Sequence, residues 1–166
     1  MIKRIIVHWT GGAYQPNEKE YNSYHFLLTG DGLTVKGKYT PQDNENCTDG
    51  IYAAHTGGGN TGSIGFAFCG MLGYQEGKPN STKYPLTFKQ CEAGWKKIAE
   101  LCKLYGLSIN PETVMTHFEF GLKHPNTTSK GKIDIVYLHP YPEQNKYHIG
   151  EFIRNKVLWY TNKYFS

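Results

Sequence analysis

The sequence predicts an α/β fold, a single domain over residues 1–166 in which a central mixed β-sheet is flanked by helices. Two observations indicate this class. Short β-rich runs separated by turn signals fill much of the chain, and helical periodicity occurs twice in its second half. A length of 166 residues is typical of one domain with one compact core. No internal repeat and no linker to a second domain is visible in the sequence.

Two apolar runs predict core strands. Residues 2–9 form a β-rich run that opens into a Thr-Gly-Gly loop, which indicates a buried strand with His8 near its end. Residues 63–69 form a second run, preceded by the glycine-rich polar stretch 56–62. We expect this stretch to lie at the rim of a cleft.

A hairpin is predicted between these two strands. Residues 24–28 and 33–36 flank Gly30-Asp31-Gly32, and glycine supplies the positive φ that tight turns require. The hairpin would add two strands to the sheet.

The second half of the chain predicts two helices and one short strand. Apolar residues recur at helical spacing from Thr87 to Gly106, with a capping box at the start and a glycine stop. Residues 113–116 are a short strand that delivers His117 to an irregular segment, 118–131. Helical spacing then returns from residue 149 to the C-terminus.

Composition excludes two classes of protein. Hydrophobic residues make up 39% and charged residues 19%, and no run of about 18 apolar residues occurs, so neither a disordered nor a transmembrane chain fits. The N-terminus lacks the apolar stretch and cleavage site of a signal peptide, so we expect cytoplasmic synthesis without classical export. A net charge of +4 permits a polyanionic partner such as a wall polymer or a nucleic acid.

Three residues can supply the ligands of a catalytic zinc ion. Such a site takes three protein ligands, commonly His or carboxylate, and leaves one position for water. His8, His117 and Asp134 each stand at or beside the end of a short apolar run, and a sheet can gather such ends into one cleft. Spacing alone does not select them, because seven histidines allow many triads. The same set could also hold other divalent ions.

An ordered set of short motifs carries a family resemblance. The motifs are Val7-His8-Trp9-Thr10, Tyr24-His25-Phe26, His55 with Asn60 and Ser63-Ile64-Gly65, Thr116-His117, and Lys132-Ile133-Asp134. In this order they resemble the type 2 N-acetylmuramoyl-L-alanine amidases, a family that includes phage lysozymes, the AmpD amidases and the peptidoglycan recognition proteins. The resemblance covers residues 2–134 and implies hydrolysis of the amide bond between N-acetylmuramic acid and L-alanine in peptidoglycan.

The resemblance implies roles for five residues. His8 matches the first zinc ligand and His117 the second, while Asp134 falls where the family has Cys or Asp as the third. Lys132 matches the catalytic lysine, and Tyr24 matches a tyrosine that some active members use beside the metal. This chemistry is physically coherent, because zinc polarises the amide carbonyl while an ammonium and a hydroxyl stabilise the charge that develops on its oxygen.

Three more residues are candidates for the site. Glu119 is the carboxylate to test as general base or as a group that supports a ligand from behind, since on an extended segment it would share the face of His117; the alternative is a solvent-facing side chain. His55 is expected to contact substrate or orient a ligand, or else to serve the structure of the glycine-rich loop. Asn60 is expected to bind substrate. One departure from the family is the pair Asp134-Ile135, which replaces the usual Cys-Pro or Asp-Pro and puts the local turn in question.

Three classes of function are compatible with the sequence. The first is a zinc hydrolase, acting as a phage or prophage endolysin that reaches the wall with the help of a holin, or as an enzyme that recycles wall fragments. The second is a non-catalytic peptidoglycan-binding protein of the same fold, which the retained ligand set and Lys132 disfavour. The third is a regulatory protein, since a phage relative also binds a polymerase. We expect a monomer with Zn2+ as cofactor and peptidoglycan as partner, and neither nucleic acid nor membrane.

Overall fold

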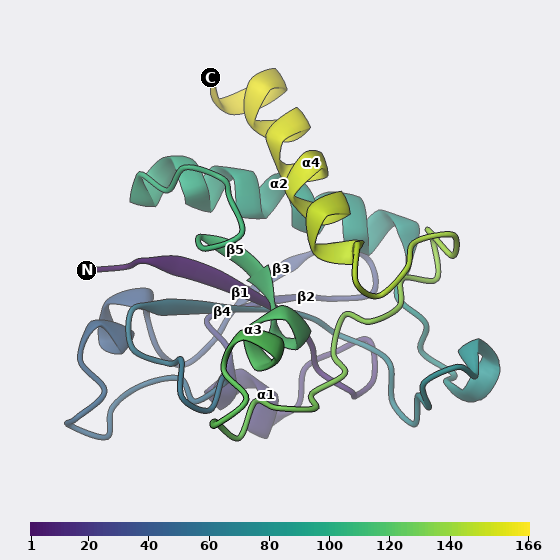
Figure 1. Ribbon diagram of the computed structural model, residues 1–166, viewed down its shortest axis with the longest axis horizontal. Coiled ribbons are helices and arrows are strands. Elements are labelled where there is room, and N and C mark those ends of the chain that lie inside the picture. Colours follow the sequence, from purple (N-terminus) through teal and green to yellow (C-terminus); the bar gives the residue numbers. More distant parts are fainter.

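A computed structural model describes all residues from 1 to 166, and its strands form one five-stranded sheet (Figure 1). The strands are β1 (Arg4–Trp9), β2 (Phe26–Leu28), β3 (Thr34–Lys36), β4 (Ser63–Phe68) and β5 (Val114–Thr116). Their order across the sheet is β3-β2-β4-β1-β5. β3 is antiparallel to β2, and the other neighbours are parallel, which confirms the predicted mixed sheet.

Helices cover both faces of this sheet (Figure 1). The α-helices are α1 (Glu18–Ser23), α2 (Phe88–Tyr105), α3 (His117–Lys123) and α4 (Ile149–Tyr160). Short 3-10 turns occupy Pro41–Glu45 and Pro79–Ser81, and a π-helical turn, Thr161–Phe165, continues α4. The two long helices, α2 and α4, pack against each other on one face, whereas α1 and α3 lie on the other side. None of these helices has the length and apolar character needed to span a bilayer.

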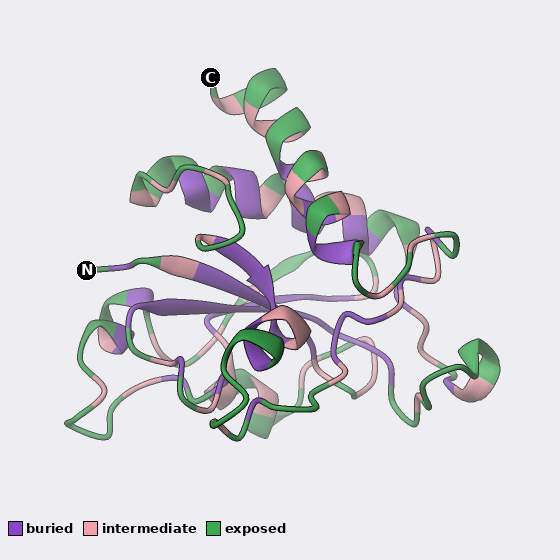
Figure 2. Cartoon of the chain, viewed as in Figure 1, coloured by how far each residue is buried: buried purple, intermediate pink, exposed green.

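Side-chain alternation along β1 decides where His8 points. Ile5, Val7 and Trp9 belong to the main hydrophobic cluster, which also contains the buried faces of α2 and α4. Ile6 faces the opposite side and packs with residues of β5 and α3 in a small second cluster. Because successive strand residues point to opposite faces, His8 shares the side of Ile6. Figure 2 shows the inner strands as deeply buried, whereas the edge strand β3 is mostly exposed.

Helix α2 matches its predicted start and stop. Thr87 and Gln90 form the expected capping box, and Gly106 ends the helix with φ of 66°. Gly94 lies in the helix interior, where glycine costs about 1 kcal/mol relative to alanine. A Cβ atom there would lie 2.2 Å from the ring of Phe68, so glycine is the residue that lets β4 and α2 approach closely.

The start of the segment predicted to be irregular is helical. Residues 117–123 form α3, and Thr116 and Glu119 make a reciprocal capping box at its start. The prediction of an irregular segment from residue 118 was therefore wrong for its first turns. The spacing Thr-x-x-Glu in the sequence, which is typical of a helix start, would have predicted this helix. The short helix α1, capped by Asn17, was also not predicted.

Candidate metal centre

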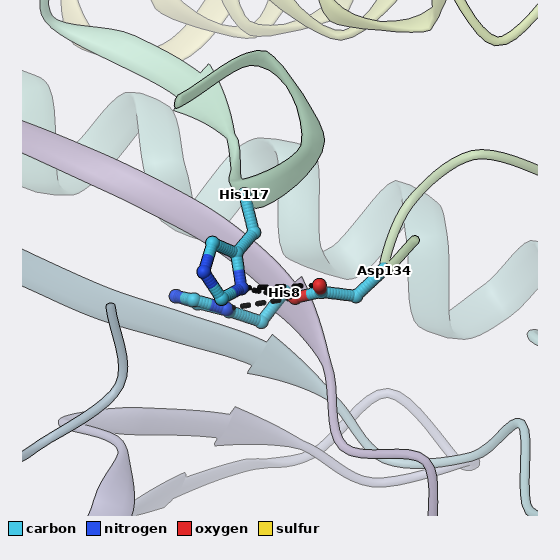
Figure 3. Close-up of side chains that lie close together, drawn as sticks. All are labelled: His8, His117 and Asp134. Atoms are coloured by element: carbon cyan, nitrogen blue, oxygen red, sulfur yellow. Dashed lines mark hydrogen bonds and ion pairs between the residues drawn. The ribbon is translucent and has the colours of Figure 1, made fainter. Parts of the chain in front are cut away.

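Three predicted ligands meet at one edge of the sheet (Figure 3). His8 is near the end of β1, and His117 follows β5 directly as the first residue of α3. β1 and β5 are parallel neighbours, so both histidines leave the sheet at the same edge. Asp134, from the loop after α3, places Oδ2 2.8 Å from Nδ1 of His8 and 3.1 Å from Nδ1 of His117. One ligand atom from each residue lies within 4.8 Å of the other two.

The outer nitrogen of His8 is held by the glycine-rich loop. Nε2 of His8 lies 3.1 Å from Nδ1 of His55 and 3.2 Å from Oγ1 of Thr56. Nε2 of His55 is 3.4 Å from the carbonyl oxygen of Ser63, which can only accept a hydrogen bond. In the arrangement that satisfies all of these contacts, His55 carries its proton on Nε2, its Nδ1 accepts from Oγ1–H of Thr56 at 2.7 Å, and His8 donates through Nε2–H. Nδ1 of His8 is left as a lone pair facing Asp134.

The outer nitrogen of His117 has a matching partner. Its Nε2 lies 3.0 Å from Oγ of Ser129, and that hydroxyl donates to the carbonyl oxygen of Gly57 at 2.8 Å. Because the hydroxyl donates its only hydrogen to Gly57, it can only accept from Nε2–H of His117. Nδ1 of His117 is likewise left as a lone pair facing Asp134.

These donor sets fit a cation. Two imidazole lone pairs and one carboxylate converge in a buried space, an arrangement that is repulsive unless a positive charge lies between them. Burial lowers the pKa of His8, which favours the neutral ligand form. Burial raises the pKa of Asp134, but the neighbouring His117 and His8 outweigh this effect and hold that pKa well below its usual range, so the carboxylate stays charged. The three residues are thus suited to bind a divalent metal.

The centre opens into a cleft of about 460 Å³. The lining residues are Trp9, Thr10, Gly11, Tyr24, Ala54, His55, Thr56, Gly57, Asn60, His117, Thr128, Lys132, Ile133 and Asp134. The ring of Tyr24 lies 5.2 Å from that of His8, and Lys132 is an exposed residue of the same lining. Burial raises the pKa of Tyr24, so its hydroxyl remains protonated and able to donate. A hydroxyl and an ammonium therefore share the cleft with the centre.

Comparison with known proteins shows which family the chain belongs to. The family model described as N-acetylmuramoyl-L-alanine amidase matches residues 1–151. The chain belongs to this amidase family. A search of curated proteins found no match.

Two solved structures share the amidase fold. N-acetylmuramoyl-L-alanine amidase LysC from Clostridium intestinale URNW matches with a TM-score of 0.55 and 14% identity, over 95% of this chain and 85% of that one. A mutant of PlyL matches with a TM-score of 0.52 and 21% identity, over the same shares of the two chains. At these identities the likeness concerns the fold alone.

Two of the predicted amidase site residues serve the glycine-rich loop as well as the cleft. The side-chain oxygen of Asn60 accepts from the backbone N–H groups of His55 and Thr56, at 2.9 and 2.8 Å. His55 in turn orients His8, as described above. Both residues line the cleft, so their predicted contact with substrate stays a prediction alongside an observed structural role.

Glu119 is not part of the amidase cleft. Its Oε1 accepts from the backbone N–H of Thr116 at 3.0 Å, and its carboxylate pairs with Arg154 of α4. The segment is helical rather than extended, so Glu119 does not share the direction of His117. We correct its expected role as a base to that of a helix cap and ion-pair partner.

Two residues around the centre escaped the sequence analysis, and a third, Ile135, lies in the turn that the sequence had put in question. Thr56 contacts Nε2 of His8, and Ser129 contacts Nε2 of His117. Thr56 directly follows the motif residue His55, which could have pointed to it, whereas no motif residue adjoins Ser129. Ile135, after Asp134, has a φ of 67°, a left-handed conformation that is rare for a β-branched residue. Proline cannot adopt it, so the turn differs from the Asp-Pro pattern of the family.

Proposed function

We propose that this chain is a zinc-dependent hydrolase that cuts the amide bond between N-acetylmuramic acid and L-alanine in peptidoglycan. One observation carries the proposal: Nδ1 of His8, Nδ1 of His117 and the Asp134 carboxylate converge in the cleft of an amidase family member. Three protein ligands with a position left for water are the set that a catalytic zinc ion takes. The donor set is also compatible with other divalent ions, which the test below includes.

Residues of the cleft would hold the metal and stabilise the charge that develops on the substrate. Bound at the three ligands, zinc supplies Lewis acidity toward the amide carbonyl and lowers the pKa of water at the site. The Tyr24 hydroxyl and the Lys132 ammonium hydrogen-bond to the carbonyl oxygen, where negative charge develops as the carbonyl carbon becomes tetrahedral. Each donor of this kind is worth about 3 kcal/mol in the transition state. Asp134 is the only carboxylate among the cleft-lining residues, so we assign no separate carboxylate base.

We further propose that the enzyme is a phage or prophage endolysin, a single amidase domain over residues 1–166 that acts on the wall as a monomer. An enzyme that recycles wall fragments would use the same chemistry, and the two are separated by a lysis assay. Co-expression with a holin should lyse the host, whereas expression of His117→Ala with the same holin should not. Growth without lysis in both cultures would favour fragment recycling.

The test of the activity is product analysis on purified peptidoglycan. The native protein should release soluble stem peptide with new L-alanine amino groups and no new reducing sugar ends. Chelation should abolish release, and added zinc should restore it more fully than magnesium or calcium. His117→Ala should be inactive at any metal concentration. Wall binding without cleavage by the zinc-loaded protein would overturn the proposal in favour of a recognition protein.

A further inference from the structure

We propose that Ser129 is a positioning residue that fixes the tautomer of His117 and so readies its Nδ1 atom for the metal. The inference rests on the metal site of the proposed function. It concerns a side chain that lines no part of the cleft and lies 12 residues beyond the ligand that it contacts.

Hydrogen bonding around Ser129 leaves one consistent assignment. Oγ of Ser129 lies 2.8 Å from the carbonyl oxygen of Gly57, which has no hydrogen to give. The serine hydrogen therefore points to Gly57, and the contact with Nε2 of His117 at 3.0 Å has to be donated by the imidazole. The proton of the neutral ring is thereby held on Nε2.

The other tautomer is disfavoured by burial. Ser129 is fully buried and His117 is nearly so. A proton on Nδ1 would leave the lone pair of Nε2 against the lone pairs of Oγ, with no water available to separate them. Asp134 faces Nδ1 and favours that proton until a cation binds, so Ser129 acts against this competing tautomer. The tautomer that Ser129 selects is the one whose Nδ1 can coordinate a metal beside Asp134.

Two close approaches at glycines hold the loop of Ser129, one made by the Thr128 side chain and one by the Ser129 backbone. A Cβ atom on Gly57 would lie 1.7 Å from Oγ1 of Thr128, and one on Gly121 of α3 would lie 2.2 Å from the carbonyl oxygen of Ser129. Both values are far below any van der Waals contact. The loop of Ser129 is thus wedged between the glycine-rich loop and α3, and it reaches both because each neighbour is glycine at the contact.

A matched pair of serine variants tests the inference. Ser63 is also fully buried, and its hydroxyl donates to the carbonyl of Gly59 in the glycine-rich loop but touches no imidazole. The contact of Ser63 with His55 is made by its backbone carbonyl, which Ser63→Ala keeps. Ser129→Ala and Ser63→Ala therefore remove the same group from similar surroundings. Zinc affinity is measured by competition with a chromophoric chelator at fixed pH. The tautomer of His117 is measured by 15N NMR of metal-free protein that carries Asp134→Ala, in which no carboxylate competes for the Nδ1 proton, and is assigned with His117→Ala.

The expected result separates the two serines. Ser129→Ala should weaken zinc affinity about 10- to 100-fold and lose the predominance of the Nε2–H form. Ser63→Ala should keep the affinity and the tautomer of the native protein even where its thermal stability falls. Equal affinity of Ser129→Ala and the native protein, or an equal loss in both variants, would overturn the inference. Absence of zinc binding by the native protein would instead overturn the metal site itself.

Discussion

The Glu119 carboxylate and the Arg154 guanidinium face each other in a two-point ion pair, with Nη1–Oε1 and Nη2–Oε2 distances of 3.0 and 3.1 Å. Both side chains are mostly buried. The pair ties the start of α3 to α4, and the same carboxylate caps α3 through the N–H of Thr116. Because α3 begins with His117, a carboxylate that never reaches the cleft still helps to place a ligand.

The first prediction concerns Glu119→Gln. The variant keeps the size of the side chain but leaves Arg154 without its counter-charge, so the free energy of unfolding should fall by about 2 kcal/mol. Chemical denaturation of the metal-free protein measures this change. Once folded and zinc-loaded, the variant should keep a kcat close to that of the native enzyme. A kcat lowered about 100-fold or more at full zinc occupancy would restore Glu119 as a candidate base.

The second prediction concerns the two donors of the cleft. Lys132→Ala and Tyr24→Phe should each lower kcat on peptidoglycan by about 100- to 1000-fold, because each removes one donor to the developing charge. Zinc affinity should change little, since neither residue is a ligand. Lys130→Ala removes an exposed lysine two residues away, outside the cleft, and is the matched control. A loss shared by Lys130→Ala would mean that net charge, not a placed donor, is responsible.

The third prediction is a loss of stability in weak acid that His25 causes. Nδ1 of His25 accepts from the N–H of Gly65 at 2.9 Å, and Nε2 donates to the side-chain oxygen of Asn44 at 2.9 Å. Burial lowers the pKa of His25 from 6.5 to about 4. The neutral form is therefore favoured in the folded state, and between pH 6.5 and about 4 the unfolded chain binds a proton that the folded chain does not.

Stability should accordingly be complete above pH 6.5 and decline as the pH falls toward 4. The share of His25 is about 3 kcal/mol at most. His8 and His55 are buried with lowered pKa values and add to the decline in the same direction. His25→Asn keeps an acceptor for Gly65 and cannot titrate, so its unfolding free energy should vary less steeply with pH. Chelated protein is used, and an unchanged slope in this variant would contradict the assignment.

Much of the metal site was predictable because it depends on strand ends. The apolar run before His8 predicted a strand, and the short run before His117 predicted another, so local pattern placed both histidines at strand ends, whereas the family resemblance selected them as ligands. Glu119 was misplaced because a histidine two residues away suggested extended geometry, although the spacing from Thr116 is that of a capping box. The capping-box spacing was therefore the better predictor of the structure around Glu119 than its distance from His117.

The supports of the ligands could not be predicted in this way. Ser129 meets the carbonyl of Gly57 across 72 positions of sequence. That contact exists because the loop that carries Ser129 approaches the glycine-rich loop at Gly57. The periodicity of the sequence predicts helices and strands but does not show which loops meet. The resemblance to a family identified the residues that we propose as metal ligands, whereas only the packed structure identifies the groups that orient them.

The last prediction concerns Ile135, the residue after Asp134. It holds a φ of 67°, which costs about 1 to 2 kcal/mol for a residue with a Cβ atom, and its fully buried side chain in the main hydrophobic cluster offsets that cost. Ile135→Pro would introduce the residue usual in the family, but proline fixes φ near −65° and would turn Asp134 away from His8 and His117.

We therefore expect Ile135→Pro to lose zinc affinity as well as stability. Ile135→Gly permits the same φ without strain, so it should keep zinc affinity while the missing side chain lowers the free energy of unfolding by about 2 kcal/mol. The two variants thus separate backbone conformation from side-chain packing, because only the first should affect the metal. Calorimetric zinc titration of both variants measures the difference, and native affinity in Ile135→Pro would mean that the left-handed turn is not what directs Asp134 into the centre.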